Sequence, residues 1–248
     1  METPLIFILV LFLVAALYAS VGHGGASGYL ALMALFGMSA VMMKASALTL
    51  NLFVSAISFY AYYRQGYFRI RLLIPFVVGS IPMAFLGAQV AIDPGLYKVI
   101  LGLFLVVAVA RMLIQPKAKQ HEVIHFQWVL AMVIGAFLGF FSGMIGIGGG
   151  IILSPVLLLL GWANVKETAA VSAIFIFLNS TAGLAGLYST GIQVNPEILI
   201  WIGAALSGGL LGAHMGAAKL SLTGLRYVLA IVLFMASIKL ITPLFLHF

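Results

Sequence analysis

The stretch VGHGGASGYL, residues 21–30, places four glycines, His23 and Ser27 inside an otherwise apolar segment. Glycine costs about 1 kcal/mol relative to alanine in a helix interior, so a cluster of glycines predicts that a helix ends here. A second stretch, MIGIGGGIIL at residues 144–153, repeats the pattern, with Gly146 falling 124 residues after Gly22. The sequence therefore predicts two matched helix breaks.

The surrounding composition is that of a membrane protein. Of the 248 residues, 64% are apolar and 7% are charged, whereas a soluble domain carries about a quarter charged residues. Residues 3–43 and 123–165 contain no Asp, Glu, Lys or Arg, and each run is about twice the ~20 residues that one spanning helix needs. These runs predict a polytopic membrane protein, with two apolar segments in each run.

Ten apolar segments can be placed along the chain. A polar linker at residues 116–125 divides them into a first membrane repeat, 1–115, and a second, 126–248. Since the chain contains no cysteine, disulfides and Cys-ligated metals are excluded, and we expect no cofactor. The segments are expected near 4–21, 25–43, 45–63, 72–92, 96–115, 126–145, 149–162, 168–188, 196–218 and 225–246.

The two halves resemble each other over most of their length. Besides the glycine tracts, YYRQG ending at Gly66 matches LYSTG ending at Gly191, and LGAQ at Leu86 matches LGAH at Leu211, each 125 residues apart. Five segments per half is an odd number, so the second half should enter the membrane from the opposite side. The predicted fold is all-α, with two inverted-topology repeats of five segments and Gly-broken or re-entrant helices.

The basic residues test this topology. With the N-terminus outside, nine of the twelve Lys and Arg residues fall on the inner side, as the positive-inside rule expects. Both termini are then predicted on the outer side of the inner (plasma) membrane. The nine are Arg64, Arg69, Arg71, Arg111, Lys117, Lys119, Lys166, Lys219 and Arg226, and the three outer ones are Lys44, Lys98 and Lys239.

The glycine tracts are candidate anion sites. A helix that restarts after a break presents unpaired N–H groups and the positive end of its dipole. Two such ends facing each other across an inverted repeat could hold one small oxyanion; the alternative is that the glycines only allow tight turns or close helix packing. The candidate tract residues are Gly22, His23, Gly24, Gly25 and Ser27 in the first repeat, and Gly146, Gly148, Gly149 and Gly150 in the second.

Further polar side chains are predicted at membrane depth. Ser27 and Ser154 fall early in the restarted segments, where a hydroxyl could donate to an oxyanion or bond to its own backbone. Asn51 and Asn179 lie in the third segment of each half, about one turn out of register, and either line a pore or link helices. All four are kept as substrate-binding candidates together with His23 and the tract glycines.

Histidines are the candidates for proton coupling, because no carboxylate lies within a predicted span. Because an unperturbed histidine changes charge near neutral pH, His23 and His214 could carry a proton. His214 should point away from a ridge formed by Gly208, Gly212 and Gly216, which indicates a packing face. Lys44 could attract anions, but a long side chain near a helix end is expected to extend to the interface.

The chain resembles the TauE/SafE sulfite exporter family. The resemblance rests on SVGHGGASGYLALMALFG at residues 20–37, its repeat SGMIGIGGGIILSPVLLLLGW at 142–162, and the two LGA helices. It implies a secondary anion transporter of bacterial membranes for sulfite, organosulfonates or other sulfur oxyanions. One departure from the internal symmetry is that Ile147 stands where the first repeat has His23.

A rival interpretation comes from a different class of protein. GASG at residues 25–28 has the Gly-x-Ser-Gly form of rhomboid intramembrane proteases, and AHMG at 213–216 resembles their Ala-His-x-x-Gly helix. Ser27 and His214 would then be a nucleophile and its general base. The duplication and the missing His-x-x-x-Asn pattern argue against it, so we do not expect an enzyme. A passive anion channel is the remaining alternative, because it would share every site feature.

The sequence thus predicts an alternating-access exporter whose partners are a small oxyanion and the lipid bilayer, with no role for nucleic acid. A homo-oligomer is left open.

Overall fold

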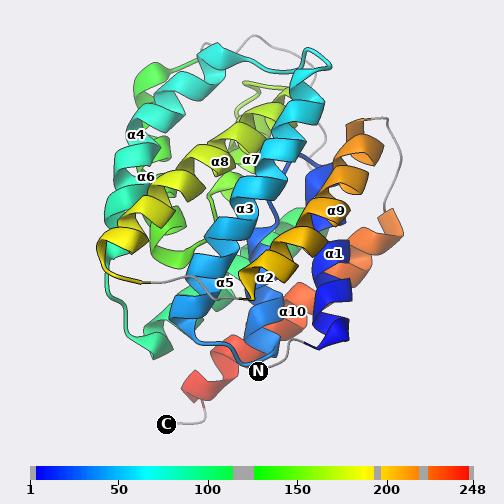
Figure 1. Ribbon diagram of the computed structural model, residues 1–248. Coiled ribbons are helices and arrows are strands. Elements are labelled where there is room, and N and C mark those ends of the chain that lie inside the picture. Colours follow the sequence, from blue (N-terminus) through cyan, green and yellow to red (C-terminus); the bar gives the residue numbers. More distant parts are fainter. Residues whose placement is uncertain (1–3, 114–125, 193–196, 218–222, 246–248) are drawn as a thin grey trace.

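In a computed structural model, the residues described are 4–113, 126–192, 197–217 and 223–245. These residues form ten α-helices and no strand, which confirms the predicted all-α class (Figure 1). The polar linker, with Lys117 and Lys119, lies outside the described residues. The helices are α1 Leu5–Ser20, α2 Ala26–Leu35, α3 Ala40–Tyr63, α4 Ile70–Gln89, α5 Pro94–Leu113, α6 Trp128–Ile145, α7 Gly150–Leu159, α8 Val165–Ser189, α9 Ile198–Ala217 and α10 Thr223–Phe245.

Five of these helices are long and apolar enough to cross a membrane. They are α3, α4, α6, α8 and α9, as judged over the described residues. Large apolar side chains cover their outward faces, for example Val129 and Phe137 on α6 and Leu199 and Leu210 on α9. An apolar outer surface combined with backbone groups paired inside helices is what the interior of a bilayer requires.

Both glycine tracts are helix breaks, as predicted. Helix α1 ends at Ser20 and α2 begins at Ala26, while α6 ends at Ile145 and α7 begins at Gly150. With ten residues each, α2 and α7 are about 15 Å long, half the thickness of the hydrocarbon core. Phe36, after α2, packs edge-on against Phe7 near the start of α1, so α2 returns to the end of the bundle where α1 begins.

The second and seventh segments are shorter than predicted. The prediction of an apolar segment over 25–43 was wrong, because α2 stops at Leu35, Gly37 turns the chain at φ +75°, and Ser39 caps the start of α3. Similarly, α7 ends at Leu159 rather than continuing to residue 162, and Gly161 has φ +65°. Apolar side chains continue through both turns, so hydropathy alone does not mark them.

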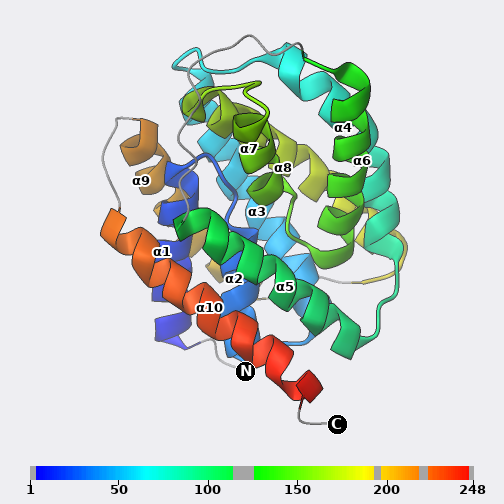
Figure 2. The ribbon, with the colours of Figure 1, turned by 180° about the vertical axis from the view of Figure 1, so that it is seen from behind.

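Eight of the helices pack in two blocks, which contact each other through α3 of one block and α8 of the other. The α3 block consists of α1, α2, α3 and α9, and the α8 block consists of α4, α6, α7 and α8. Each block therefore combines the first three helices of one half of the sequence with the fourth helix of the other half. Helices α5 and α10 pack against each other across the back of the α3 block (Figure 2).

Glycines bring one helix pair in each block into backbone contact. A Cβ on Gly208, Gly212 or Gly216 of α9 would overlap the carbonyl oxygens of Phe12, Ala16 and Ser20 of α1, respectively. The equivalent ladder in the α8 block joins Gly135, Gly139 and Gly143 of α6 to Phe76, Ser80 and Ala84 of α4. Both pairs run parallel, and the predicted packing ridge on α9 is confirmed. By contrast, α3 and α8 run antiparallel, since Tyr62 packs with Ala169 and Leu48 packs with Leu184.

Two lysines join the blocks at opposite ends of the bundle. Lys44 of α3 donates to the carbonyl of Ala88 in the last turn of α4, with Nζ and O 2.7 Å apart. Lys166 of α8 donates to the carbonyl of Gly216 in the last turn of α9, also at 2.7 Å. Carbonyls of a last helical turn lack an intrahelical partner and favour a cation. The expectation that Lys44 extends to the interface was wrong: its side chain is directed inward to this carbonyl and the residue is only 7% exposed.

The two ends of the bundle differ in charge. Arg64, Arg69, Arg71 and Lys166 gather where α3 ends and α8 begins, and Arg69 forms a 2.7 Å salt bridge with Glu167. We call this the basic end. Lys44, Lys98 and Lys239 lie toward the opposite end, where α1 begins and α10 ends (Figure 1).

Candidate anion site at the paired helix breaks

The two breaks meet near the middle of α3 and α8. A Cβ on Gly24 would overlap the Asn51 side-chain oxygen and lie 3.0 Å from the Ile176 methyl Cγ2. A Cβ on Gly148 would lie 2.6 Å from the Asn51 nitrogen and 3.0 Å from the same Ile176 methyl group. The matched glycines therefore approach the same two side chains, one from each central helix.

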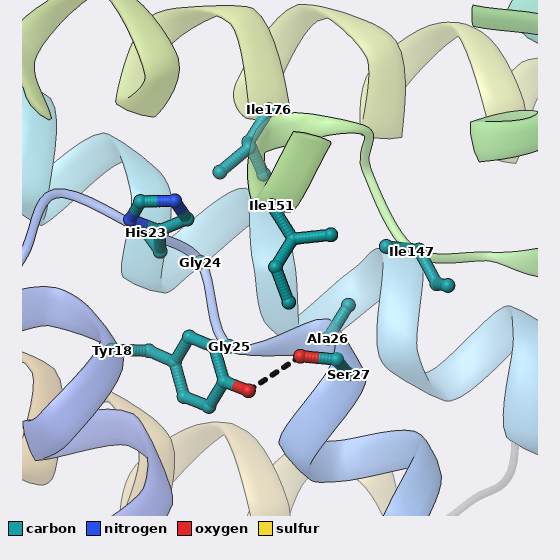
Figure 3. A pocket seen from close by; sticks show the side chains of 9 residues that line it. All are labelled: Tyr18, His23, Gly24, Gly25, Ala26, Ser27, Ile147, Ile151 and Ile176. Carbon is teal, nitrogen blue, oxygen red and sulfur yellow. Dashed lines mark hydrogen bonds between the residues drawn. The ribbon is translucent and has the colours of Figure 1, made fainter. Parts of the chain in front are cut away.

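A small pocket opens beside this meeting point. The space not occupied by atoms between its lining residues, including its mouth, amounts to about 180 Å³. Its polar wall comes from the first break and the end of α1, and its apolar wall is formed by three isoleucines (Figure 3). None of the lining residues carries a carboxylate. They are Tyr18, His23, Gly24, Gly25, Ala26, Ser27, Ile147, Ile151 and Ile176.

The N-terminus of α2 forms the floor of the pocket. Gly25 caps this helix at φ +102°, a conformation that L side chains rarely adopt. The first bond within the helix is donated by the Tyr29 N–H to the Gly25 carbonyl, at 3.0 Å. The N–H groups of Ala26, Ser27 and Gly28 precede it and have no acceptor within the helix. They point to the end of the helix where the dipole favours negative charge.

Hydroxyl groups add to this polar wall. The hydroxyls of Tyr18 and Ser27 form a short hydrogen bond to each other, in which either can be the donor. Ser27 is 2% exposed, so this bond lies inside the protein rather than at its surface. Of the hydroxyl candidates predicted from the sequence, Ser27 reaches the pocket. Tyr18 reaches it too and was not predicted from the sequence.

His23 connects the pocket to the second half of the chain. Its Nε2 lies 2.9 Å from the Ser154 hydroxyl and 3.2 Å from the Gly150 carbonyl, while Nδ1 lies 3.0 Å from the Val21 carbonyl. Ser154 in turn lies 2.9 Å from the Ser172 hydroxyl of α8. Ser154 is therefore a partner of the imidazole and does not line the pocket. The chain His23–Ser154–Ser172 crosses from one block to the other.

The two asparagines have different surroundings. Asn51 donates to the Ile147 carbonyl and the Ser180 hydroxyl, both at 3.3 Å, and so ties α3 to the second break. Asn179 donates to the Phe175 carbonyl of its own helix at 2.9 Å and does not line the pocket. The residue that faces Asn51 across the breaks is Ile176, 125 residues later in the chain. Ile176 is thus the counterpart of Asn51, and Asn179, three residues further along α8, is not.

The second glycine tract supports the pocket from behind. Ile147 and Ile151 line it, whereas Gly146, Gly148, Gly149 and Gly150 do not. Gly148 has φ +79° and fits against Asn51 and Ser180. Gly146 packs on Lys44, and in the matching position of the first tract Gly22 packs on Ala169. Of the two tracts predicted to present backbone to a ligand, the first contributes glycines to the lining of this pocket and the second does not.

The structure does not bring His214 to the pocket. Its side chain is exposed on the outer surface of α9, away from the face that contacts α1. Ser27 is bonded to Tyr18, and no hydrogen bond within the described residues joins Ser27 to His214. The geometry therefore gives no support to the protease interpretation.

A bundle with two half-length helices meeting at a buried polar pocket is the architecture of a membrane transporter. The family model described as sulfite exporter TauE/SafE matches residues 7–240, and the chain belongs to this family of membrane transporters.

Curated relatives agree with this assignment. The chain is 37% identical over 246 residues to the probable membrane transporter protein y4hK of Sinorhizobium fredii, covering 97% of this chain and all of that protein. It is 26% identical over 186 residues to the probable membrane transporter protein YunE of Bacillus subtilis, covering 67% and 68% of the two chains. No solved structure matches the chain.

Proposed function

We propose that the protein is a secondary transporter that exports a small sulfur oxyanion, such as sulfite or an organosulfonate. The observation that carries the proposal is the N-terminus of α2. The first two residues of this helix, Ala26 and Ser27, line a pocket that is also lined by Tyr18 and His23. Their hydrogen-bond donors are neutral or weakly basic, so they can hold an anion without the tight grip of a buried lysine. The sulfur class follows from the description of the family.

Alternating access fits the packing of the two blocks. In the proposed cycle, the α3 block and the α8 block rock about the contact between α3 and α8, where the two breaks meet. The Lys44–Ala88 and Lys166–Gly216 contacts cross from block to block at opposite ends, so each closes one end of the path. Both contacts are formed here, in agreement with the small size of the pocket. Opening either end then requires one lysine to leave its carbonyl.

An inverted repeat supports the same cycle. Corresponding helices exchange between the blocks, α9 packing on α1 as α4 packs on α6, and α3 and α8 run in opposite directions. The two halves would thus give similar closing contacts at the two ends. We propose the basic end as the cytoplasmic side, since basic residues favour that side.

His23 is the proposed proton carrier for coupling. It is buried, it lies at the pocket, and its Ser154–Ser172 chain ends on α8 in the other block. A change in its charge would act on the anion and on the block contact together. His214, on the outer surface, has no such connection, so the proposal rests on His23 alone.

A thermal-shift panel on the detergent-purified protein tests the substrate class. Sulfite, thiosulfate and sulfoacetate would be compared with small carboxylates, with chloride as the control for ionic strength. A ligand of the native state at 100 times its Kd adds about 2.7 kcal/mol of stability, so a sulfur oxyanion should raise Tm. Ser27→Ala should reduce this rise, whereas Ser207→Ala, which removes an exposed hydroxyl on α9, should not. The proposal fails if none of the sulfur oxyanions stabilises the wild type.

A further inference from the structure

One buried hydroxyl lies next to Gly25, a residue that lines the pocket, and has no hydrogen-bond partner among the described residues. Tyr29 is fully buried, and its OH has no hydrogen-bond partner among the described residues. A buried polar group left without a partner destabilises the folded state by about 1–3 kcal/mol. Phenylalanine would fill nearly the same volume without that penalty. A role in binding a ligand would explain why the residue is a tyrosine.

The position of Tyr29 places this hydroxyl at the N-terminus of α2. Tyr29 is the fourth residue of the helix, and side chains on a helix lean toward its N-terminus. A Cβ on Gly25, the capping residue, would lie 2.6 Å from both Cζ and the hydroxyl oxygen of Tyr29. The phenol therefore reaches back along the helix to the residue that begins the candidate anion site.

The other buried tyrosines show what is exceptional about Tyr29. The hydroxyl of Tyr62 donates to the Ser20 carbonyl at 2.7 Å, and that of Tyr97 donates to the Ile145 carbonyl at 2.9 Å. Tyr18 pairs with Ser27. Each of these three phenols has a hydrogen-bond partner in the protein, whereas Tyr29 has none among the described residues and lies where an anion is proposed to bind.

We propose that Tyr29 is a substrate-binding residue whose O–H donates to an oxygen of the bound anion. This inference rests on the proposed function and deepens it. The bound oxyanion supplies the acceptor that the empty site lacks. The site then combines three backbone N–H groups at the start of α2 with phenol and serine hydroxyls, all of them neutral donors. Neutral donors allow a doubly or singly charged anion to bind and leave again.

Tyr29→Phe tests the proposal, with Tyr62→Phe as the matched control. Sulfite would be titrated against each purified full-length variant, and the thermal shift would give both the Tm of the empty protein and an apparent Kd. Tyr29→Phe should leave the Tm of the empty protein unchanged or raise it, yet weaken sulfite binding about tenfold, because a hydrogen bond to a charged group is lost. Tyr62→Phe should lower the Tm and leave the apparent Kd unchanged.

The outcomes separate this inference from the proposed function. If sulfite binds to Tyr29→Phe as tightly as to the wild type, the role of Tyr29 is refuted while the anion site stands. A lower Tm for empty Tyr29→Phe would show that the hydroxyl has a structural partner, and would also overturn the inference. If no sulfur oxyanion stabilises the wild type, the proposed function fails and the inference falls with it.

Discussion

At the scale of single residues, His23 breaks the likeness between the two glycine tracts. Its counterpart in the second tract is Ile147, and both residues line the same pocket. His23 carries the polar contacts to Ser154 and Gly150, and Ile147 contributes to the apolar wall. A single imidazole on one side of a near-symmetric site gives the two sides different chemistry.

His23→Gln should uncouple transport from an imposed pH gradient, because glutamine can donate a hydrogen bond but cannot carry a proton near neutral pH. Uptake of radiolabelled sulfite into proteoliposomes would be measured with and without the gradient. His214→Gln is the matched control, since that side chain is exposed away from the pocket, and it should keep the dependence of the wild type. Full gradient dependence in His23→Gln would remove His23 from the coupling proposal.

The sequence identified some of the pocket residues but not their partners. His23, Ser27 and the first glycine tract could be predicted because polar and helix-breaking residues stand out in an apolar segment. Tyr18 could not, since an aromatic residue near a helix end is common in membrane proteins. The bond from His23 to Ser154 joins residues 131 positions apart, and only the tertiary packing of α7 brings them together.

At the scale of helices, glycine ladders determine which helices pair. The predicted ridge on α9 proved to be the contact face for α1. The same four-residue spacing recurs on α6, but the sequence did not show that α6 packs on α4, because the polar linker separates the two helices along the chain.

Gly212→Ala should destabilise the protein, because its Cβ would overlap the Ala16 carbonyl oxygen and push α1 away from α9. We expect a loss of about 1–3 kcal/mol, as for other overpacked sites. Gly203→Ala on the same helix is the control: nothing lies within 4 Å of its added Cβ, and alanine favours the helix by about 1 kcal/mol. Thermal unfolding in detergent should show Tm falling for the first variant and unchanged or rising for the second. An equal Tm for both would contradict the ladder.

Helix ends were predicted less well than helix breaks. The first tract was located because its glycines form a cluster, whereas the end of α2 depends on a single glycine, Gly37, within a continuous apolar run. A turn of this kind leaves hydropathy unchanged, so the segment predicted over 25–43 absorbed the start of α3.

At the scale of the whole molecule, the two lysine contacts define the ends of the proposed path. Two residues after each lysine lies a buried hydroxyl without a partner among the described residues: Ser46 after Lys44, and Thr168 after Lys166. These hydroxyls are suited to line the path when the corresponding end opens. The chain contains no cysteine, so either position can be replaced by a single reporter thiol.

Lys44→Met should open the Lys44 end, because the last turn of α4 loses its cation. In this background Ser46→Cys should react faster with a membrane-impermeant maleimide, and Thr168→Cys should not. Lys166→Met should produce the opposite pattern. Equal labelling in all four combinations would show that the lysines only cap helices and do not close the path.

The orientation of the bundle can be tested with the same chemistry. Gln65 is exposed at the basic end, and Ala91 is exposed at the opposite end, just after α4. In right-side-out membrane vesicles, Ala91→Cys should be labelled by an impermeant maleimide and Gln65→Cys should be labelled only after permeabilisation. The reverse pattern would place the basic end outside and contradict the proposed topology.

The central claim is that a sulfur oxyanion binds at the paired breaks and is carried across by alternating access. The most direct measurement is counterflow: proteoliposomes loaded with unlabelled sulfite and diluted into a trace of radiolabelled sulfite. A transporter of this kind should take up label above its equilibrium level for a time, with a saturable rate that Tyr29→Phe and Ser27→Ala reduce. Label that only equilibrates, at a rate linear in sulfite concentration, would show a passive channel instead and would contradict the account.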